Sequence, residues 1–265
     1  MPAFLITAVL AFVVSCLATR EMLAMLRRAA VLDHPNARSS HDIPTPRGGG
    51  IAVIASIAAA ALAWTILAGH ESGGLGPVMG LALALSVLSF IDDLRNLSAG
   101  LRLAAHGLAV AGGLWALDGV GAFAAYLPQP VDLALTALAW LWFINLYNFM
   151  DGIDGIVGSE TATIATGHAG LALLGLAPAA VLGPAAAMAG AALGFLVWNW
   201  HRAKLFLGDS GSIPLGFLLG YLLISTAAPG GGALAAALVL PLVFVVDATV
   251  TLLRRLARGK RPTEA

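Results

Sequence analysis

Amides and carboxylates recur at every third position near the middle of this chain. The polar members are Asn145, Asn148, Asp151 and Asp154, and the last two are each followed by a glycine. In a helix, side chains three residues apart lie along one side, so these four would form a polar stripe at the end of an apolar stretch. Helix capping is the alternative, since Asn and Asp are frequent at helix ends. The repeated spacing, together with glycines that let a ligand approach the backbone, favours a binding site.

Two adjacent carboxylates, Asp92 and Asp93, precede Asn96 and Arg102. Neighbouring carboxylates repel one another unless a cation or a basic group lies beside them. A divalent metal ion, or an arginine that positions phosphate, would relieve that repulsion. A solvated turn is the alternative when the segment is considered alone. Because successive helical residues point about 100° apart, we expect only one of the pair to face a shared site directly.

A third segment runs from Asn199 to Ser212 and contains Lys204 and Asp209. Asp209 follows a glycine and lies just ahead of an apolar stretch. A carboxylate at the start of a helix can hold a cation while nearby backbone N–H groups receive phosphate oxygens. The segment therefore predicts a second group suited to phosphate chemistry.

The fourth polar segment, residues 33–50, contains His41 and Arg47 and ends in three glycines. Its prolines stiffen the chain, and its glycines free the backbone just before an apolar stretch. His41, Arg47 and the glycine amides could therefore approach an anion. A purely structural turn is the alternative.

The elements that must position these segments follow from composition. Hydrophobic residues make up 59% of the 265 residues and charged residues only 11%, too few polar side chains to cover a soluble globule of this size. The formal net charge is zero, so no overall field attracts nucleic acid. Cys16 is the one cysteine and excludes an internal disulfide. The chain is therefore predicted to be a polytopic membrane protein.

Nine apolar stretches approach the length of about 20 residues needed to cross the hydrocarbon layer. They cover approximately residues 3–19, 49–68, 75–91, 101–117, 131–147, 155–176, 178–198, 212–227 and 232–253. With these spans, all 14 Lys and Arg residues fall on one side of the membrane. Because basic loops stay inside, we expect the N-terminus outside, the C-terminus inside and the four polar segments facing the cytosol. No internal repeat or soluble domain is visible, so residues 1–265 are predicted to form one all-α transmembrane bundle.

Together the four segments resemble the polyprenyl-phosphate N-acetylhexosamine-1-phosphate transferases, a family that includes the enzyme that starts peptidoglycan lipid intermediates. The matching motifs are His41-x-x-Pro44-Thr45-Pro46-Arg47-Gly48-Gly49, Asp92-Asp93 with Asn96 and Arg102, Asn145-x-x-Asn148-x-x-Asp151-Gly152-x-Asp154-Gly155, and Gly208-Asp209-x-Gly211-Ser212. The first motif is most similar to the branch that initiates O-antigen and other surface glycans. The resemblance covers roughly residues 32–259.

The resemblance implies a Mg2+-dependent transferase, with Mn2+ as an alternative metal. Such an enzyme transfers a sugar-1-phosphate from a UDP-N-acetylhexosamine to undecaprenyl phosphate and releases UMP. It would lie in the bacterial cytoplasmic membrane as a multi-pass protein and serve lipopolysaccharide or cell-wall biogenesis. Dimers are common among related enzymes, so a homodimer is one assembly to consider, and the oligomeric state stays open. Joining two anions requires charge neutralisation and in-line positioning more than covalent help from the protein, which suits the residues present. Direct attack by the lipid phosphate is the preferred mechanism, and a two-step route through an aspartyl intermediate stays open.

The resemblance also implies residue roles. Asp209 and Asn148 would bind the metal ion, Asp92 or Asp93 would position or deprotonate the lipid phosphate, Arg102 would hold phosphate with support from Asn96, and Asp154 would lie toward the uracil. Further substrate contacts are expected from His41, Arg47, Asn145, Asp151 and Lys204. Asp92, Asp93 and Asp209 are thus the catalytic candidates.

The family pattern continues past the ninth span with a His-rich cytoplasmic loop and a last membrane segment. This sequence ends at Ala265, soon after a basic stretch, and we expect it to lack both parts. Two other classes of function are open. A secondary transporter could use Asp151, Asp154 and Asp247 as cation sites within the bundle. An inactive, truncated lipid-binding homologue is the other. Trp140, Trp142, Trp198 and Trp200 are expected to be interfacial anchors.

Overall fold

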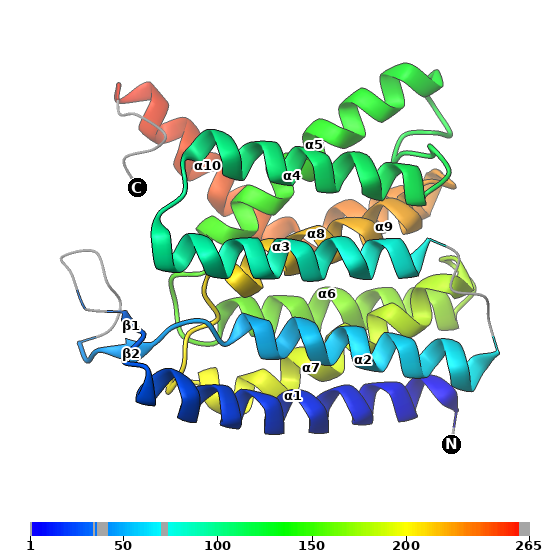
Figure 1. The fold of residues 1–265 in the computed structure, drawn as a ribbon. Helices are drawn as coiled ribbons and strands as arrows, with labels where there is room; N and C mark the ends of the chain where they lie inside the picture. Colours follow the sequence, from blue (N-terminus) through cyan, green and yellow to red (C-terminus); the bar gives the residue numbers. More distant parts are fainter. Residues whose placement is uncertain (1, 34, 36–41, 70–73, 260–265) are drawn as a thin grey trace.

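The structure, a computed structural model, describes residues 2–33, 35, 42–69 and 74–259. Its elements in chain order are α1 (Ala3–Arg28), β1 (Leu32–Asp33), β2 (Thr45–Pro46), α2 (Gly50–Ala68), α3 (Leu75–Arg95), α4 (Ala99–Ala116), α5 (Gln129–Phe149), α6 (Ile156–Leu173), the 3-10 helix η1 (Ala179–Val181), α7 (Leu182–Asn199), α8 (Asp209–Ala227), α9 (Gly231–Val239) and α10 (Leu242–Ala257). The helices lie roughly alongside one another as a bundle (Figure 1). The expectation of an all-α bundle is confirmed, with one antiparallel pair of two-residue strands.

Helices α7 and α8 form the buried centre of the bundle. Helix α3 packs on α8, α5 packs on α8 from another side, and α1 packs along α7. Small residues allow the close approach of α1 to α7: a Cβ added to Gly194 would lie 2.4 Å from the carbonyl oxygen of Phe12. The hydroxyl of Ser15 donates to the carbonyl of Ala191 across the same interface. Close backbone contact of this kind stabilises helix pairs in a lipid environment.

Within the part of the chain that the structure describes, five helices are long and apolar enough to cross a membrane, namely α1, α3, α5, α8 and the combined segment of η1 and α7. The bent pair of α9 and α10 would make a sixth. Helices α2, α4 and α6 lie where further spans were expected, but they do not meet the same length and hydropathy requirement. A multi-pass membrane architecture is therefore supported, whereas the full set of nine spans and the orientation of the termini stay predictions.

The last apolar stretch is a broken helix and differs from the single span expected for residues 232–253. Helix α9 ends at Val239, α10 begins at Leu242, and the two are bent by 62°. Pro241 lies at the break, where it has no backbone N–H to continue the helical hydrogen bonding. In Figure 1, α10 consequently leaves the body of the bundle.

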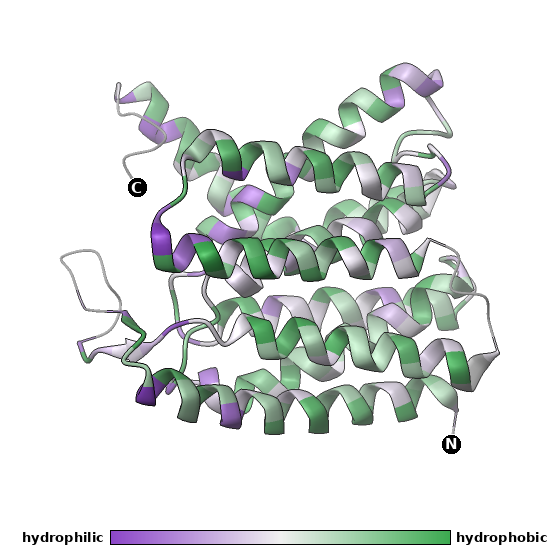
Figure 2. Ribbon diagram, viewed as in Figure 1, coloured by the Kyte–Doolittle hydropathy of each residue, from purple (hydrophilic) through white to green (hydrophobic). Residues whose placement is uncertain are grey.

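Hydrophilic residues gather at one end of the bundle (Figure 2). This end holds the β1–β2 pair, the C-terminal ends of α1 and α3 and the start of α4, and it is opposite the N-terminus (Figure 1). The described parts of all four polar segments lie there, as the distribution of basic residues predicts. We refer to it as the polar end.

The expectation that Trp140 anchors the protein at an interface is wrong. Its side chain is 2% exposed, stacks on Phe217 with 4.9 Å between ring centroids, and donates its N–H to the carbonyl of Phe217. Gly113 and Gly220 leave the space that the indole fills. A buried tryptophan with a satisfied N–H stabilises the α5–α8 contact. Trp200, by contrast, is exposed.

Candidate active site

Two loops that are distant in the sequence are joined by backbone hydrogen bonds at the polar end. The amides of Gly48 and Gly49 donate to the carbonyl of Phe206, and the amide of Gly50 donates to that of Leu207. The starts of α2 and α8 touch directly, since a Cβ on Gly50 would lie 2.2 Å from the backbone of Gly211. The glycine amides are therefore engaged with this second loop, and the expected use of these N–H groups for an anion finds no support here.

Arg47 links two carboxylates from different helices. Its Nη2 lies 2.5 Å from Asp209 Oδ1 at the start of α8 and 3.0 Å from Asp93 Oδ1 near the end of α3. Burial alone would lower the pKa of Arg47, but Asp209 and Asp93 raise it above its usual value. The arginine is thus a fixed positive charge between two acids. Of the adjacent pair Asp92 and Asp93, only Asp93 joins this cluster.

Asp151 is the third acid of this cluster. It accepts a backbone hydrogen bond from Gly208. Burial raises the pKa of Asp151 to about 7, nearby Asp209 adds to the rise, and the attraction of Arg47 opposes it. Asp93 similarly accepts a backbone hydrogen bond from Ser210. The amides of Gly208 and Ser210 therefore meet protein carboxylates, where the sequence had suggested phosphate oxygens.

We call Arg47, Asp93, Asp151 and Asp209 the acidic cluster. Three carboxylates around one guanidinium leave an excess of negative charge. One buried oxygen, Asp93 Oδ2, has no hydrogen-bond partner among the described residues. Asn148 adds an amide oxygen at the start of α8, oriented by the hydroxyl of Ser212 at 2.5 Å. Oxygen donors and excess negative charge fit Mg2+, a hard cation.

These residues fit a metal ion that is held partly by protein side chains and partly by a bound substrate. Among the described residues, no three His, Cys, Asp or Glu side chains lie close enough to hold a metal ion by themselves. Mg2+ keeps several waters and is commonly bound through one or two carboxylates and substrate phosphates. The expected ligands Asp209 and Asn148 are compatible with that arrangement.

Asp92 has a different environment from its neighbour. It is buried, its Oδ1 accepts the N–H of Leu97 at 2.6 Å, and its Oδ2 lies 3.3 Å from Arg102 Nη1. Both oxygens are therefore engaged, and the side chain fixes Arg102 at the start of α4. Asn96 is exposed and ends α3 with a left-handed backbone (φ 50°).

Asp154 lies in a separate polar cavity. It accepts the N–H of Ala203 at 3.0 Å and lies 3.3 Å from His201 Nδ1. The cavity has a volume of about 650 Å³ and is also lined by Lys204, whose ammonium lies over the ring of Trp198. Its other lining residues include Arg27, Arg202 and Phe206. The cavity is large enough for part of a soluble polar ligand.

The prediction of a continuous helical stripe from Asn145 to Asp154 is wrong in its second half. Helix α5 ends at Phe149, and residues after it form a turn. The four polar side chains therefore face different partners. Asn145 contacts α4, Asn148 contacts α8, Asp151 joins the acidic cluster and Asp154 lines the polar cavity. His41 lies outside the described residues.

Two polar residues of this region carried no role in the sequence prediction. Asn199, at the end of α7, accepts the N–H of Gly155 and donates to the carbonyl of Leu205. His106 of α4 is buried beside Asn145, four residues after Arg102. The spacing of His106 and Arg102 places them on one side of a helix, and that signal was available in the sequence.

We expect Asn199→Ala to lower the melting temperature, because it leaves two buried backbone groups without partners. The loss corresponds to about 1–3 kcal/mol for each unsatisfied group. It would also weaken the connection between the Asp151–Asp154 turn and the loop leading to Asp209. Thermal unfolding in detergent measures the effect. Asn199→Asp keeps the acceptor for Gly155, so its melting temperature should lie between those of the unmodified protein and Asn199→Ala. Equal melting temperatures of all three proteins would contradict the bridging role of Asn199.

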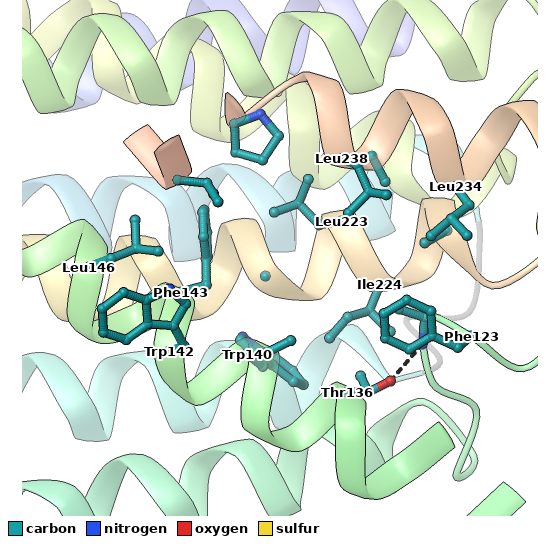
Figure 3. Close-up of a pocket in the computed structure, with 17 residues that line it drawn as sticks. Phe123, Thr136, Trp140, Trp142, Phe143, Leu146, Leu223, Ile224, Leu234 and Leu238 are labelled. Atoms are coloured by element: carbon teal, nitrogen blue, oxygen red, sulfur yellow. Dashed lines mark hydrogen bonds between the residues drawn. The ribbon is translucent and has the colours of Figure 1, made fainter. Parts of the chain in front are cut away.

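An apolar cavity of about 200 Å³ lies among α5, α8, α9 and α10. Figure 3 shows Trp140, Trp142, Phe143 and Leu146 of α5 along one side and Leu223, Ile224, Leu234 and Leu238 along another. The hydroxyl of Thr136 accepts the N–H of Ala122 at the end away from the polar end. From Thr136 to Leu146 the lining of α5 extends about 15 Å at 1.5 Å per residue. Its inner end reaches the turn of α5 that carries Asn145.

The fold and this site define a multi-pass membrane protein with an acidic, arginine-containing cluster at one end of the bundle and an apolar cavity among α5, α8, α9 and α10. The family model for glycosyl transferase family 4 matches residues 75–227. The chain belongs to this family.

Named relatives agree with that membership. The chain is 31% identical to a decaprenyl-phosphate N-acetylglucosaminephosphotransferase of Mycolicibacterium smegmatis, over 95% of the chain and 70% of the relative. It is 28% identical to a probable undecaprenyl-phosphate N-acetylglucosaminyl 1-phosphate transferase of Bacillus subtilis, over 98% and 75%. A phospho-N-acetylmuramoyl-pentapeptide-transferase of Mycolicibacterium vanbaalenii is 30% identical, over 80% and 71%. Against a Mycobacterium tuberculosis relative, the chain spans 59% of that protein's length.

Proposed function

We propose that this protein transfers a sugar-1-phosphate of N-acetylhexosamine type from a UDP-sugar to undecaprenyl phosphate and releases UMP. The observation that carries the proposal is the meeting of two environments along α5. Its C-terminal turn contributes Asn148 beside the acidic cluster, and its preceding turns line the apolar cavity. A reaction between a soluble dianion and a membrane-borne phosphate needs both environments within reach of one another.

The acidic cluster supports the transfer step. In a direct displacement, an oxygen of the lipid phosphate forms a bond to the phosphorus that carries the sugar, while the bond from that phosphorus to the UMP oxygen breaks. Bound Mg2+ would neutralise the diphosphate charge and stabilise the departing UMP. Arg47 supplies a fixed positive charge next to Asp209 and Asp93, both of which lie against its Nη2, and its Nη1 can donate to a diphosphate oxygen.

The two substrates are assigned to different cavities. The uridine half of the donor fits the polar cavity, where Asp154 can accept a hydrogen bond and Phe206 offers an aromatic side chain. Part of the prenyl chain fits the apolar cavity, and its phosphate would then emerge near Asn145 and Arg102. With basic residues at the polar end facing the cytosol, the reaction would occur at the inner face of a bacterial cytoplasmic membrane. The product would start an O-antigen or related surface glycan.

A secondary transporter is the rival proposal that uses the same carboxylates. Such a protein would hold its ion-binding residues near the membrane midplane. Here Asp93, Asp151 and Asp209 lie together at the polar end, and Asp247 of α10 is exposed. The arrangement favours the transferase.

Product formation by the purified protein tests the proposal directly. The protein would be given undecaprenyl phosphate, Mg2+ and a panel of UDP-N-acetylhexosamines, and both UMP release and the lipid-linked sugar would be measured. We expect one donor to yield equal amounts of both products and a chelator to stop the reaction until Mg2+ is returned. UMP release that does not require the lipid, or no product with any donor, would contradict the proposal for this chain.

A further inference from the structure

His106 is a buried polar side chain with no assigned role in the proposed reaction. It is 5% exposed, on the face of α4 that meets α5. It makes a side-chain hydrogen bond with Asn145, but its Nδ1 has no hydrogen-bond partner among the described residues. Buried polar atoms are rarely left unpaired in folded proteins, so such an atom indicates a missing ligand or water.

The charged neighbours of His106 come from three helices. Arg102 is one turn earlier on α4, Asp92 of α3 pairs with Arg102, and Asp209 of α8 is close enough to influence the ring. Arg102 and His106 are four residues apart and therefore lie on one side of α4. Arg102 is partly exposed, and Asp92 occupies only one of its nitrogens in an ion pair. An arginine and an imidazole on one face form a pair suited to a phosphate.

Asn145 orients the ring of His106. The amide nitrogen of Asn145 donates one of its two hydrogens to the carbonyl of Leu141 at 2.7 Å, and its oxygen can accept from His106. The remaining ring nitrogen, Nδ1, is thereby held in one direction. Asn145 lies one helical turn from Trp142, which lines the apolar cavity. A phosphate attached to a chain in that cavity would then lie about one helical turn from Asn145.

We propose that His106, through Nδ1, is a further binding residue for the phosphate of the polyprenyl acceptor and acts together with Arg102. This inference rests on the proposed function, because it assigns one substrate of that reaction to a particular pair of side chains. The second pKa of a phosphate monoester is about 6, so the monoanion can donate its O–H to Nδ1, while the dianion accepts from a protonated ring. In both cases one proton lies between a phosphate oxygen and Nδ1.

The test measures binding, so that its outcome does not depend on transfer activity. The affinity of the full chain in detergent is measured for a polyprenyl phosphate and for the matching polyprenol, by quenching of tryptophan fluorescence. The ratio of the two dissociation constants reports recognition of the phosphate alone. His106→Gln keeps an amide near the position of Nε2, and hence the contact with Asn145, but removes Nδ1. We expect this variant to reduce the preference for the phosphate about tenfold, as loss of a hydrogen bond to a charged group predicts.

His168 provides a matched control. It is fully buried in α6, its Nδ1 pairs with the hydroxyl of Thr226, and its Nε2 also lacks a partner among the described residues. His168→Gln should keep the preference for the phosphate. Where transfer activity is present, His106→Gln should raise the KM for the lipid phosphate and leave the KM for the UDP-sugar unchanged.

Three results would overturn the assignment. An unchanged ratio in His106→Gln would mean that Nδ1 faces only water. An equal loss of phosphate preference in the His106 and His168 variants would indicate a general structural effect. An increase in the KM for the UDP-sugar alone would place the donor diphosphate, rather than the lipid phosphate, at His106. Failure of the transferase itself would appear separately, as normal lipid binding without UMP release.

Discussion

Asp209→Asn should reduce the rate of sugar-1-phosphate transfer by about 1,000-fold while leaving the protein folded. The substitution keeps the volume of the side chain and one oxygen that can accept from Arg47, but it removes the negative charge at the start of α8. Asp209 is the acid that contacts Arg47 at 2.5 Å and also influences Asp93 and Asp151. Loss of its charge should therefore weaken Mg2+ binding, and the Mg2+ concentration that gives half-maximal activity should rise.

The matched control for this variant is Asp247→Asn. Asp247 is an exposed carboxylate on α10, outside the acidic cluster. Initial rates at saturating donor and lipid, together with melting temperatures, compare the two variants. We expect Asp247→Asn to behave like the unmodified protein. If Asp209→Asn retained full activity, or if only the Asp247 variant lost it, the acidic cluster could not be the transfer site.

Arg47→Gln should lower kcat/KM by about 100-fold and also make the protein depend on Mg2+ for stability. Without the guanidinium, three carboxylates face one another with no fixed counter-charge. Removing one partner of a buried ion pair destabilises a protein strongly, although the 38% exposure of the Arg47 side chain lets solvent screen part of that effect. A divalent cation that binds the folded state would then offset the repulsion by mass action.

Melting curves with and without Mg2+ measure this effect. The increase in melting temperature caused by Mg2+ should be larger in Arg47→Gln than in the unmodified protein. Arg47→Lys keeps the positive charge but loses the planar guanidinium with its several N–H donors. Compared with Arg47→Gln, it should therefore recover stability more fully than activity. Arg95→Gln, at the exposed end of α3, serves as the charge-matched control. A response to Mg2+ that is the same in all four proteins would argue against a metal ion at this cluster.

The sequence predicted the positions of the helices well because the signal is local. Apolar length and the segregation of Lys and Arg depend only on neighbouring residues, and each expected span coincides with a helix or a helix pair. Local periodicity was a poor guide at the end of α5. Asn145 and Asn148 are helical, but the chain turns after Phe149, and Asp151 and Asp154 are fixed by partners from other segments.

The contacts of the glycines also could not be predicted from local sequence patterns. Their abundance beside Arg47 and Asp209 indicated flexible loops that could approach an anion. The structure instead uses Gly50 and Gly211 for a contact between two helix ends and pairs the amides of Gly48 and Gly49 with Phe206. The partners lie more than 150 positions away in the chain, so no local pattern could identify them.

By itself, the sequence determined that this is a helical membrane protein with its polar motifs at one end, because composition and motif spacing are properties of the chain alone. Tertiary structure decided which of those residues act together. Asp93 meets Arg47 and Asp209, whereas adjacent Asp92 is committed to Arg102, and His106 becomes a candidate only when α4 packs against α5. The physical reason is that charge compensation and burial depend on distances between helices, and helix packing alone sets those distances.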